Sequence, residues 1–279
     1  RPGGTTMMSA LPAESPGGAP APRARPARPA KWLLRRPKSQ DGAPRIFLFP
    51  YAGVGASMYA LWPERIGGAE VCLVQLPGRE TRLREPHFAT YEELAGPLVE
   101  GLAPYLDRPF AFFGHCSGVL PAVEAVRELA RRGLPVPDRL FVSSQVAPHD
   151  GPYGRLLDLG EDELAGELAA LTRAAGGEPH PDLIELGVSV LAADIEANRR
   201  YRVAEPFTLP TALTTIGWRG DEVIPPALMA GWSAYAPQDR VREVLLEGAH
   251  YDFLKAPAPL LEELAHDLAE PASGTEETA

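Results

Sequence analysis

The segment Phe110–Val119, which reads FAFFGHCSGV, constrains the fold of this chain more than any other stretch. An apolar run leads directly into Gly114, Cys116 and Gly118, and a helical pattern of apolar residues follows. This layout is typical of a nucleophile elbow, a sharp strand-to-helix turn that lifts one side chain above the edge of a sheet. The turn strains the central residue, and side chains two positions before or after it would collide with neighbouring elements. The pattern therefore predicts that Cys116 is an exposed nucleophile.

Strand-like and helix-like segments alternate along the chain, which predicts a parallel sheet covered by helices on both faces. Residues 150–205 interrupt this alternation with acidic, Leu- and Ala-rich helical sequence, and we expect them to form a lid over the carboxyl edge of the sheet. Together with the elbow, the pattern predicts an α/β protein with the α/β-hydrolase fold. The expected strands are 45–50, 70–76, 110–113, 139–143, 211–216 and 241–246, and the expected helices outside the lid are 91–106, 118–132 and 259–269.

Charge and composition divide the chain into three parts. Residues 1–40 hold eight Lys or Arg and one acidic residue, whereas the rest holds 19 basic and 36 acidic residues. Because the start is rich in Pro, Ala and Gly and lacks core-forming periodicity, residues 1–42 are expected to be a disordered basic tail. Residues 43–270 are expected to form the folded domain, and residues 271–279 a second disordered tail. The acidic body argues against binding of nucleic acid.

Composition also predicts where the protein resides. No apolar run approaches the roughly 18 residues of a membrane helix, and the start of the chain lacks the apolar segment of a signal peptide. Cys72 and Cys116 lie in unlike contexts and do not suggest a disulfide framework. Cys72 falls in the middle of an apolar strand and is expected to be a packing residue. We therefore expect a monomeric, cytoplasmic protein that does not contact a membrane.

A thiol nucleophile needs a base to accept its proton, and the base needs an acid to orient it. In this fold the acid and then the histidine follow the nucleophile along the chain. His250 is the best candidate, because its loop follows the last strand and can return over the elbow. Asp221 follows the preceding strand and is the predicted acid, with the adjacent Glu222 as an alternative. The remaining histidines lie inside the elbow, in the last helix, or before any acid in the required order: His115, His266, His87, His149 and His180.

Attack on a thioester or ester carbonyl creates an oxyanion that backbone N–H groups must stabilise. Ser117, the residue after the nucleophile, is expected to provide one N–H. Ala52, in the loop after the first strand, is expected to provide the second. Ser117 is rejected as the nucleophile because it is not central between the two glycines.

Four motifs follow one another along the chain: FPYAG at 49–53, VQLPGRE at 74–80, RPFAFFGHCSG at 108–118 and GAH at 248–250. Together they closely resemble type II thioesterases, the free-standing partners of polyketide synthases and nonribosomal peptide synthetases. The resemblance implies an acyl or aminoacyl substrate on the phosphopantetheine arm of an acyl or peptidyl carrier protein. It implies no metal and no cofactor of the enzyme's own. The arm is expected to enter between lid and sheet, beside Tyr51 and Arg79 as substrate-binding residues.

The chain departs from this family at the elbow, which usually reads GHSMG and here reads GHCSG. A cysteine forms a thioester acyl-enzyme, so exchange of the acyl group with another thiol is close to thermoneutral. Hydrolytic release is the expected reaction, and transfer to a carrier thiol or an amine is the alternative. A non-catalytic carrier-binding chaperone is a third hypothesis. Pro121 lacks an N–H for the carbonyl of Ser117, so the elbow helix is expected to be kinked or to begin late.

Overall fold

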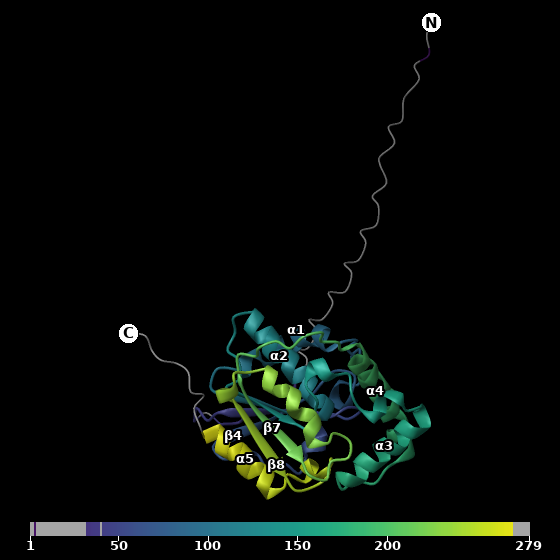
Figure 1. Ribbon diagram of the computed structural model, residues 1–279. Helices are drawn as coiled ribbons and strands as arrows, with labels where there is room; N and C mark the ends of the chain where they lie inside the picture. Colours follow the sequence, from purple (N-terminus) through teal and green to yellow (C-terminus); the bar gives the residue numbers. More distant parts are fainter. Residues whose placement is uncertain (1–2, 4–31, 40, 270–279) are drawn as a thin grey trace.

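A central sheet organises the computed structural model, which describes residue 3, residues 32–39 and residues 41–269 (Figure 1). Its strands are β1 (Leu33–Arg35), β2 (Arg45–Phe49), β3 (Arg65–Ile66), β4 (Ala69–Val74), β5 (Phe110–His115), β6 (Arg139–Ser143), β7 (Ala212–Trp218) and β8 (Val241–Leu246). They follow the order β1-β4-β2-β5-β6-β7-β8, and β3 pairs with β4. All pairings from β4 to β8 are parallel, whereas β1 and β3 run antiparallel to β4. The predicted, mostly parallel α/β sheet is confirmed.

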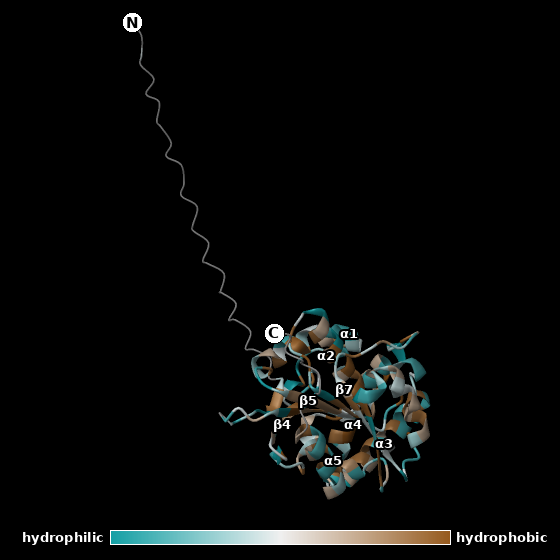
Figure 2. Ribbon diagram, turned by 60° about the vertical axis from the view of Figure 1, so that its left-hand side comes forward, coloured by the Kyte–Doolittle hydropathy of each residue, from teal (hydrophilic) through white to brown (hydrophobic). Residues whose placement is uncertain are grey.

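The period of two along each strand sends alternate side chains into two hydrophobic layers. In β2, Phe47 and Phe49 join the layer under α1 (Tyr91–Leu102) and α2 (Val119–Arg131). Ile46 and Leu48 join the opposite layer, which α5 (Ala258–Ala269) covers. Figure 2 shows this arrangement, with the sheet between α1 and α2 on one side and α5 on the other. The strands are therefore apolar on both faces, as buried parallel strands must be.

Between β6 and β7 the chain leaves the sheet and forms a helical lid. The lid helices are α3 (Glu161–Ala174) and α4 (Pro181–Arg200), which pack side by side (Figure 1). α3 buries three leucines of one face, Leu164, Leu168 and Leu171, in the same layer as α5. The lid insertion predicted from the break in alternation is confirmed. The helix pair packs onto the rest of the domain because its apolar face must be removed from water.

The predicted boundary between the N-terminal tail and the folded domain, at residue 42, is too late in the chain. Leu33–Arg35 form β1 and pair with β4, although residues 1–42 were all expected to be disordered. Trp32 holds this segment in place, because its ring is buried against Gly101 of α1. The guanidinium of Arg82 lies over the same ring, 3.9 Å from its centre. One aromatic side chain therefore anchors the edge strand. Residues 1–2, 4–31, 40 and 270–279, which include the expected C-terminal tail, lie outside the described residues.

The elbow helix begins after a 3₁₀ turn, within one residue of its expected start at 118. A 3₁₀ turn spans Cys116–Gly118, and α2 starts at Val119, so Pro121 is its third residue. The first four N–H groups of a helix have no intrahelical partner, so the missing donor costs little there. In the described part of the chain, no helix is both long and apolar enough to cross a membrane. The other 3₁₀ segments are Ala56–Tyr59, Glu80–Arg82, Ala103–Tyr105, Pro148–Asp150, Arg155–Asp158, Pro226–Ala234, Gln238–Arg240 and Asp252–Lys255.

Candidate active site

Cys116 lies at the tip of a tight turn between β5 and α2. Its φ of +49° is in the left-handed region that non-glycine residues rarely adopt. A Cβ on Gly114 would lie 2.6 Å from the backbone of Gly118, and a Cβ on Gly118 would lie 2.8 Å from the carbonyl oxygen of Pro50. Both glycines are therefore required by close backbone approach. The turn leaves Cys116 partly exposed at the carboxyl edge of the sheet.

The loops after β7 and β8 bring the predicted acid and base together. His250 Nδ1 donates to Asp221 Oδ2 at 2.8 Å, and both side chains are buried. The adjacent Glu222 is exposed, so the tertiary structure selects between the two candidate acids. Asp221 also accepts hydrogen bonds from the Ser144 hydroxyl at 2.7 Å and from the N–H groups of Val223 and Ile224 at 2.8 Å. These donors fix the carboxylate that orients the histidine ring.

Ser144 was missed by the sequence reasoning. It follows β6 directly and has a φ of +45°, so its backbone is strained at the point where its hydroxyl reaches Asp221. A polar residue at the carboxyl end of a buried strand was the available signal. It was overlooked because the acid–histidine order draws attention only to the later strands.

Electrostatics prepare His250 for proton transfer with the thiol. Burial lowers the pKa of His250, but hydrogen bonding with Asp221 and Cys116 and their negative charges raise it to about 9. Burial raises the pKa of Asp221, but the hydrogen bond and charge of His250 outweigh this and lower it. An ionised Asp221 therefore supports an imidazolium next to Cys116. In contrast, burial raises the pKa of Cys72 to about 12, which fits a packing residue.

Comparison with known proteins identifies the family. A family model described as a thioesterase domain matches residues 44–268. The chain belongs to the thioesterase family. This thioesterase is 32% identical over 232 residues to linear gramicidin dehydrogenase LgrE of Brevibacillus parabrevis. The aligned region covers 80% of this chain and 87% of LgrE.

Solved structures agree with this assignment. RedJ, a thioesterase from the prodiginine pathway of Streptomyces coelicolor, is 31% identical, with a TM-score of 0.65 over 83% of this chain and 96% of RedJ. The type II thioesterase BorB from the borrelidin cluster is 24% identical, with a TM-score of 0.71 over 86% of this chain and 97% of BorB. BorB therefore supports the fold, and RedJ supports both fold and family.

Tyr51, predicted to bind substrate, lies beside Cys116 and His250 in this thioesterase. Its side chain is buried and lines the same cavity as Cys116, and its hydroxyl is 3.4 Å from His250 Nε2. Burial, followed by the charge of Cys116, raises the pKa of Tyr51 well above its usual value, so the phenol stays neutral. A neutral hydroxyl beside the thiol can donate a hydrogen bond, and a contact with substrate stays a prediction.

The two residues predicted for the oxyanion hole contact each other. The Ala52 N–H donates to the Ser117 hydroxyl oxygen at 3.0 Å, and both residues are buried. Both also line the cavity at Cys116. The structure thus brings the two predicted residues together, and the Ser117 hydroxyl accepts a hydrogen bond from the Ala52 amide, one of the two expected oxyanion donors.

Arg79 is part of a buried ion pair with the lid of the thioesterase, which the sequence did not predict. Its guanidinium donates two hydrogen bonds of 2.8 Å to Asp194 of α4, one to each carboxylate oxygen. It also donates to the Val54 carbonyl at 3.1 Å, and His87 Nε2 lies 2.8 Å from both ions. The Gly53 N–H donates to Asp194 at 2.8 Å. We call this group, Gly53, Arg79, His87 and Asp194, the lid latch.

The lid latch changes the interpretation of Arg79. Its N–H groups already have protein partners, so its predicted contact with substrate stays a prediction. Burial raises the pKa of Asp194, but the charge of Arg79 outweighs this and holds it at about 2. Asp194 was not predicted from the sequence, although an acidic residue inside the apolar run LAADIEA indicates a buried carboxylate with a partner.

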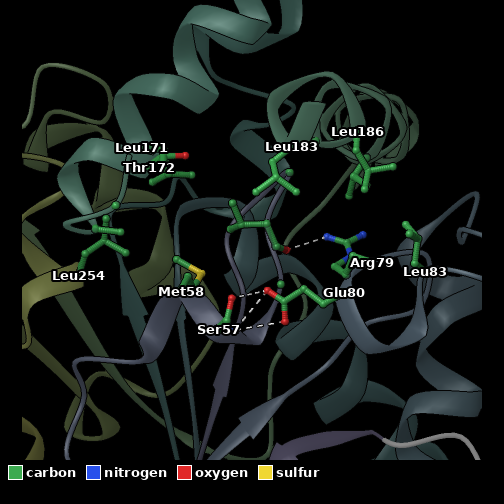
Figure 3. Close-up of a pocket in the computed structure, with 17 residues that line it drawn as sticks. Ser57, Met58, Arg79, Glu80, Leu83, Leu171, Thr172, Leu183, Leu186 and Leu254 are labelled. Atoms are coloured by element: carbon green, nitrogen blue, oxygen red, sulfur yellow. Dashed lines mark hydrogen bonds between the residues drawn. The ribbon is translucent and has the colours of Figure 1, made fainter. Parts of the chain in front are cut away.

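Two hollows lie beneath the lid, and residues of the latch line both of them. The cavity at Cys116 is small, about 30 Å³, and receives Ile195 and Asn198 from α4. A wider groove of about 420 Å³ lies between the lid helices and the loops after β2 and β4. Figure 3 shows Leu171 and Leu183 of the lid above this groove, Glu80 below it and Arg79 at its side.

Proposed function

We propose that this thioesterase acts on acyl or aminoacyl thioesters of carrier proteins, through an acyl-enzyme on Cys116 that is released by hydrolysis. The observation that carries the proposal is the geometry of Cys116. Its side chain lies at a strained elbow and interacts with His250, which is hydrogen-bonded to Asp221. A thiol, a histidine and an orienting acid are the groups that nucleophilic acyl transfer requires.

The first half-reaction forms the acyl-enzyme. The Cys116 thiolate attacks the carbonyl carbon, a C–S bond forms, and the carbonyl π electrons move onto oxygen. The oxyanion then collapses, the bond to the pantetheine sulfur breaks, and His250 gives its proton to the leaving thiolate. A pKa of about 9 for His250 supports this step, because the ring is protonated at neutral pH when the thiolate is formed.

The second half-reaction determines the product. In hydrolysis, water gives a proton to His250 while its oxygen attacks the acyl-enzyme carbonyl. The C–S bond then breaks, His250 returns the proton to the Cys116 sulfur, and the free acid is released. Transfer is the second candidate, and the nucleophile being sulfur favours it. A thioester acyl-enzyme and a carrier thioester are close in energy, so a second thiol can accept the group reversibly.

A carrier protein is the proposed partner. The motifs resemble type II thioesterases, RedJ belongs to a biosynthetic pathway, and LgrE is named for linear gramicidin. We propose that the phosphopantetheine arm enters between lid and sheet, past Tyr51. The small cavity at Cys116 favours a small acyl group. A monomeric state and a cytoplasmic location stay predictions.

One experiment separates the candidates. The protein is incubated with an aminoacyl-loaded carrier protein and a second, empty carrier protein, and all three species are followed by intact mass spectrometry. Free acid indicates hydrolysis, a loaded second carrier indicates transfer, and neither product indicates binding alone. Cys116→Ala should form no adduct, and Cys116→Ser should shift the balance toward hydrolysis. Equal transfer by the serine and cysteine forms would contradict the argument from sulfur.

A further inference from the structure

The Ser117 side chain occupies the place where the Ala52 amide would meet an oxyanion. Its hydroxyl oxygen accepts the Ala52 N–H at 3.0 Å, across 65 residues of sequence. Ser117 is 8% exposed and Ala52 is 7% exposed, so the bond is sheltered from solvent. A substrate oxygen could reach the Ala52 N–H only by displacing this hydroxyl.

The hydroxyl has a proton still to donate. A serine hydroxyl carries one donor in addition to its acceptor lone pairs. Within residues 32–39 and 41–269, no side chain or carbonyl accepts the Ser117 hydroxyl proton. Ser117 and Cys116 line the same cavity, so this proton can point to the space where the reacting carbonyl must sit.

We propose that the Ser117 hydroxyl is itself a donor of the oxyanion hole, beside the Ser117 N–H, and that the Ala52 N–H orients it. The inference rests on the proposed acylation of Cys116 and deepens it. A hydroxyl that accepts a hydrogen bond is polarised and becomes a better donor. A fixed donor in a site sheltered from water stabilises developing charge strongly, because it needs no reorientation during the reaction.

The hydroxyl keeps its proton throughout. When the Cys116 sulfur bonds to the carbonyl carbon, the π electrons move onto oxygen, and the Ser117 O–H strengthens its hydrogen bond to that oxygen. When the carbonyl re-forms, the electron pair returns and the pantetheine thiolate leaves with the proton of His250. Ser117 is therefore a catalytic residue through hydrogen bonding alone.

The test measures the single-turnover rate of Cys116 acylation by S-acetylpantetheine, using intact mass spectrometry. Loss of one oxyanion-hole donor lowers the rate about 10²- to 10³-fold, so we expect Ser117→Ala to acylate about 10²-fold more slowly, with donor affinity nearly unchanged. Ser117→Thr and Ser117→Val form a matched pair, because they have the same shape and differ in the hydroxyl. We expect the threonine variant to be at least about tenfold faster than the valine variant.

The outcomes separate this inference from the proposed function. An alanine variant that acylates as fast as wild type, or faster, overturns the inference, because the hydroxyl would then merely block the Ala52 amide. Equal rates for threonine and valine overturn it as well. Alkylation of Cys116 by iodoacetamide reports the integrity of the elbow, and an equal loss of alkylation and acylation would assign Ser117 a structural role instead. If wild type itself gains no acetyl group on Cys116 from pantetheine or carrier donors, the proposed function fails and the inference with it.

Discussion

Replacing Asp194 with asparagine tests whether the lid latch holds α4 to the loop that carries Ala52. The Arg79 and Asp194 side chains are 3% and 5% exposed, and asparagine keeps the size and one acceptor of aspartate while removing its charge. Loss of one partner of a buried ion pair costs about 3–5 kcal/mol, because the other charge stays buried. A pKa of about 2 instead of 3.8 independently corresponds to about 2 kcal/mol. We therefore expect Asp194→Asn to lower the free energy of unfolding by about 3 kcal/mol.

Urea denaturation followed by tryptophan fluorescence measures this change. Glu196→Gln is the matched control, because Glu196 lies on the same helix in a half-exposed ion pair with Arg200, and such pairs contribute about 0–1 kcal/mol. The folded pKa of Asp194 is depressed, so its stabilisation exists above about pH 4 and is lost as pH falls toward 2. The difference between wild type and Asp194→Asn should therefore shrink on acidification. A loss no larger than that of the control at neutral pH would refute the latch.

Two further predictions concern the elbow and the catalytic base. Gly114→Ala should lower the free energy of unfolding by about 1–3 kcal/mol in thermal melts, because its Cβ would lie 2.6 Å from backbone atoms. The control Gly166→Ala, in α3 with open space around it, should raise the free energy of unfolding by about 0.5–1 kcal/mol. Equal shifts for the two variants would contradict the packing argument. The rate of acylation should fall as pH rises through about 9, because His250 then loses the proton that it gives to the leaving thiolate. Asp221→Asn removes the contact that raises this pKa, so the fall should move to lower pH, and an unmoved midpoint in the pH–rate profile would be evidence against the assigned base.

The sequence was sufficient for features that depend on local chemistry and chain order. The glycines at the elbow, the position of Cys116 between them and the order of Asp221 and His250 along the chain follow from the geometry of one turn and from the parallel sheet. The start of the elbow helix was predicted to within one residue, and Pro121 falls in its first turn, where its missing N–H leaves no intrahelical bond unmade. The edge strand β1 was missed because its anchor, Trp32, is a single residue beside a long polar stretch.

Features that depend on distant partners could not be predicted in this way. The sequence placed Arg79 near the substrate, but its carboxylate partner Asp194 is 115 residues away and reaches it only after the lid folds back. The hydroxyl of Ser117 gave no local sign that it would bind the amide of Ala52, because that contact joins two different loops.

By itself, the sequence determined the sheet, the elbow and the place of Cys116 at its tip, because hydrophobic period and steric fit at glycine act over a few residues. The tertiary structure decided that Asp221 and not Glu222 meets His250, that Arg79 binds the lid, and that the Ser117 hydroxyl covers the Ala52 amide. These outcomes depend on which buried polar groups find partners when the loops converge. A buried charge or amide must be satisfied, and only the folded chain determines which group satisfies it.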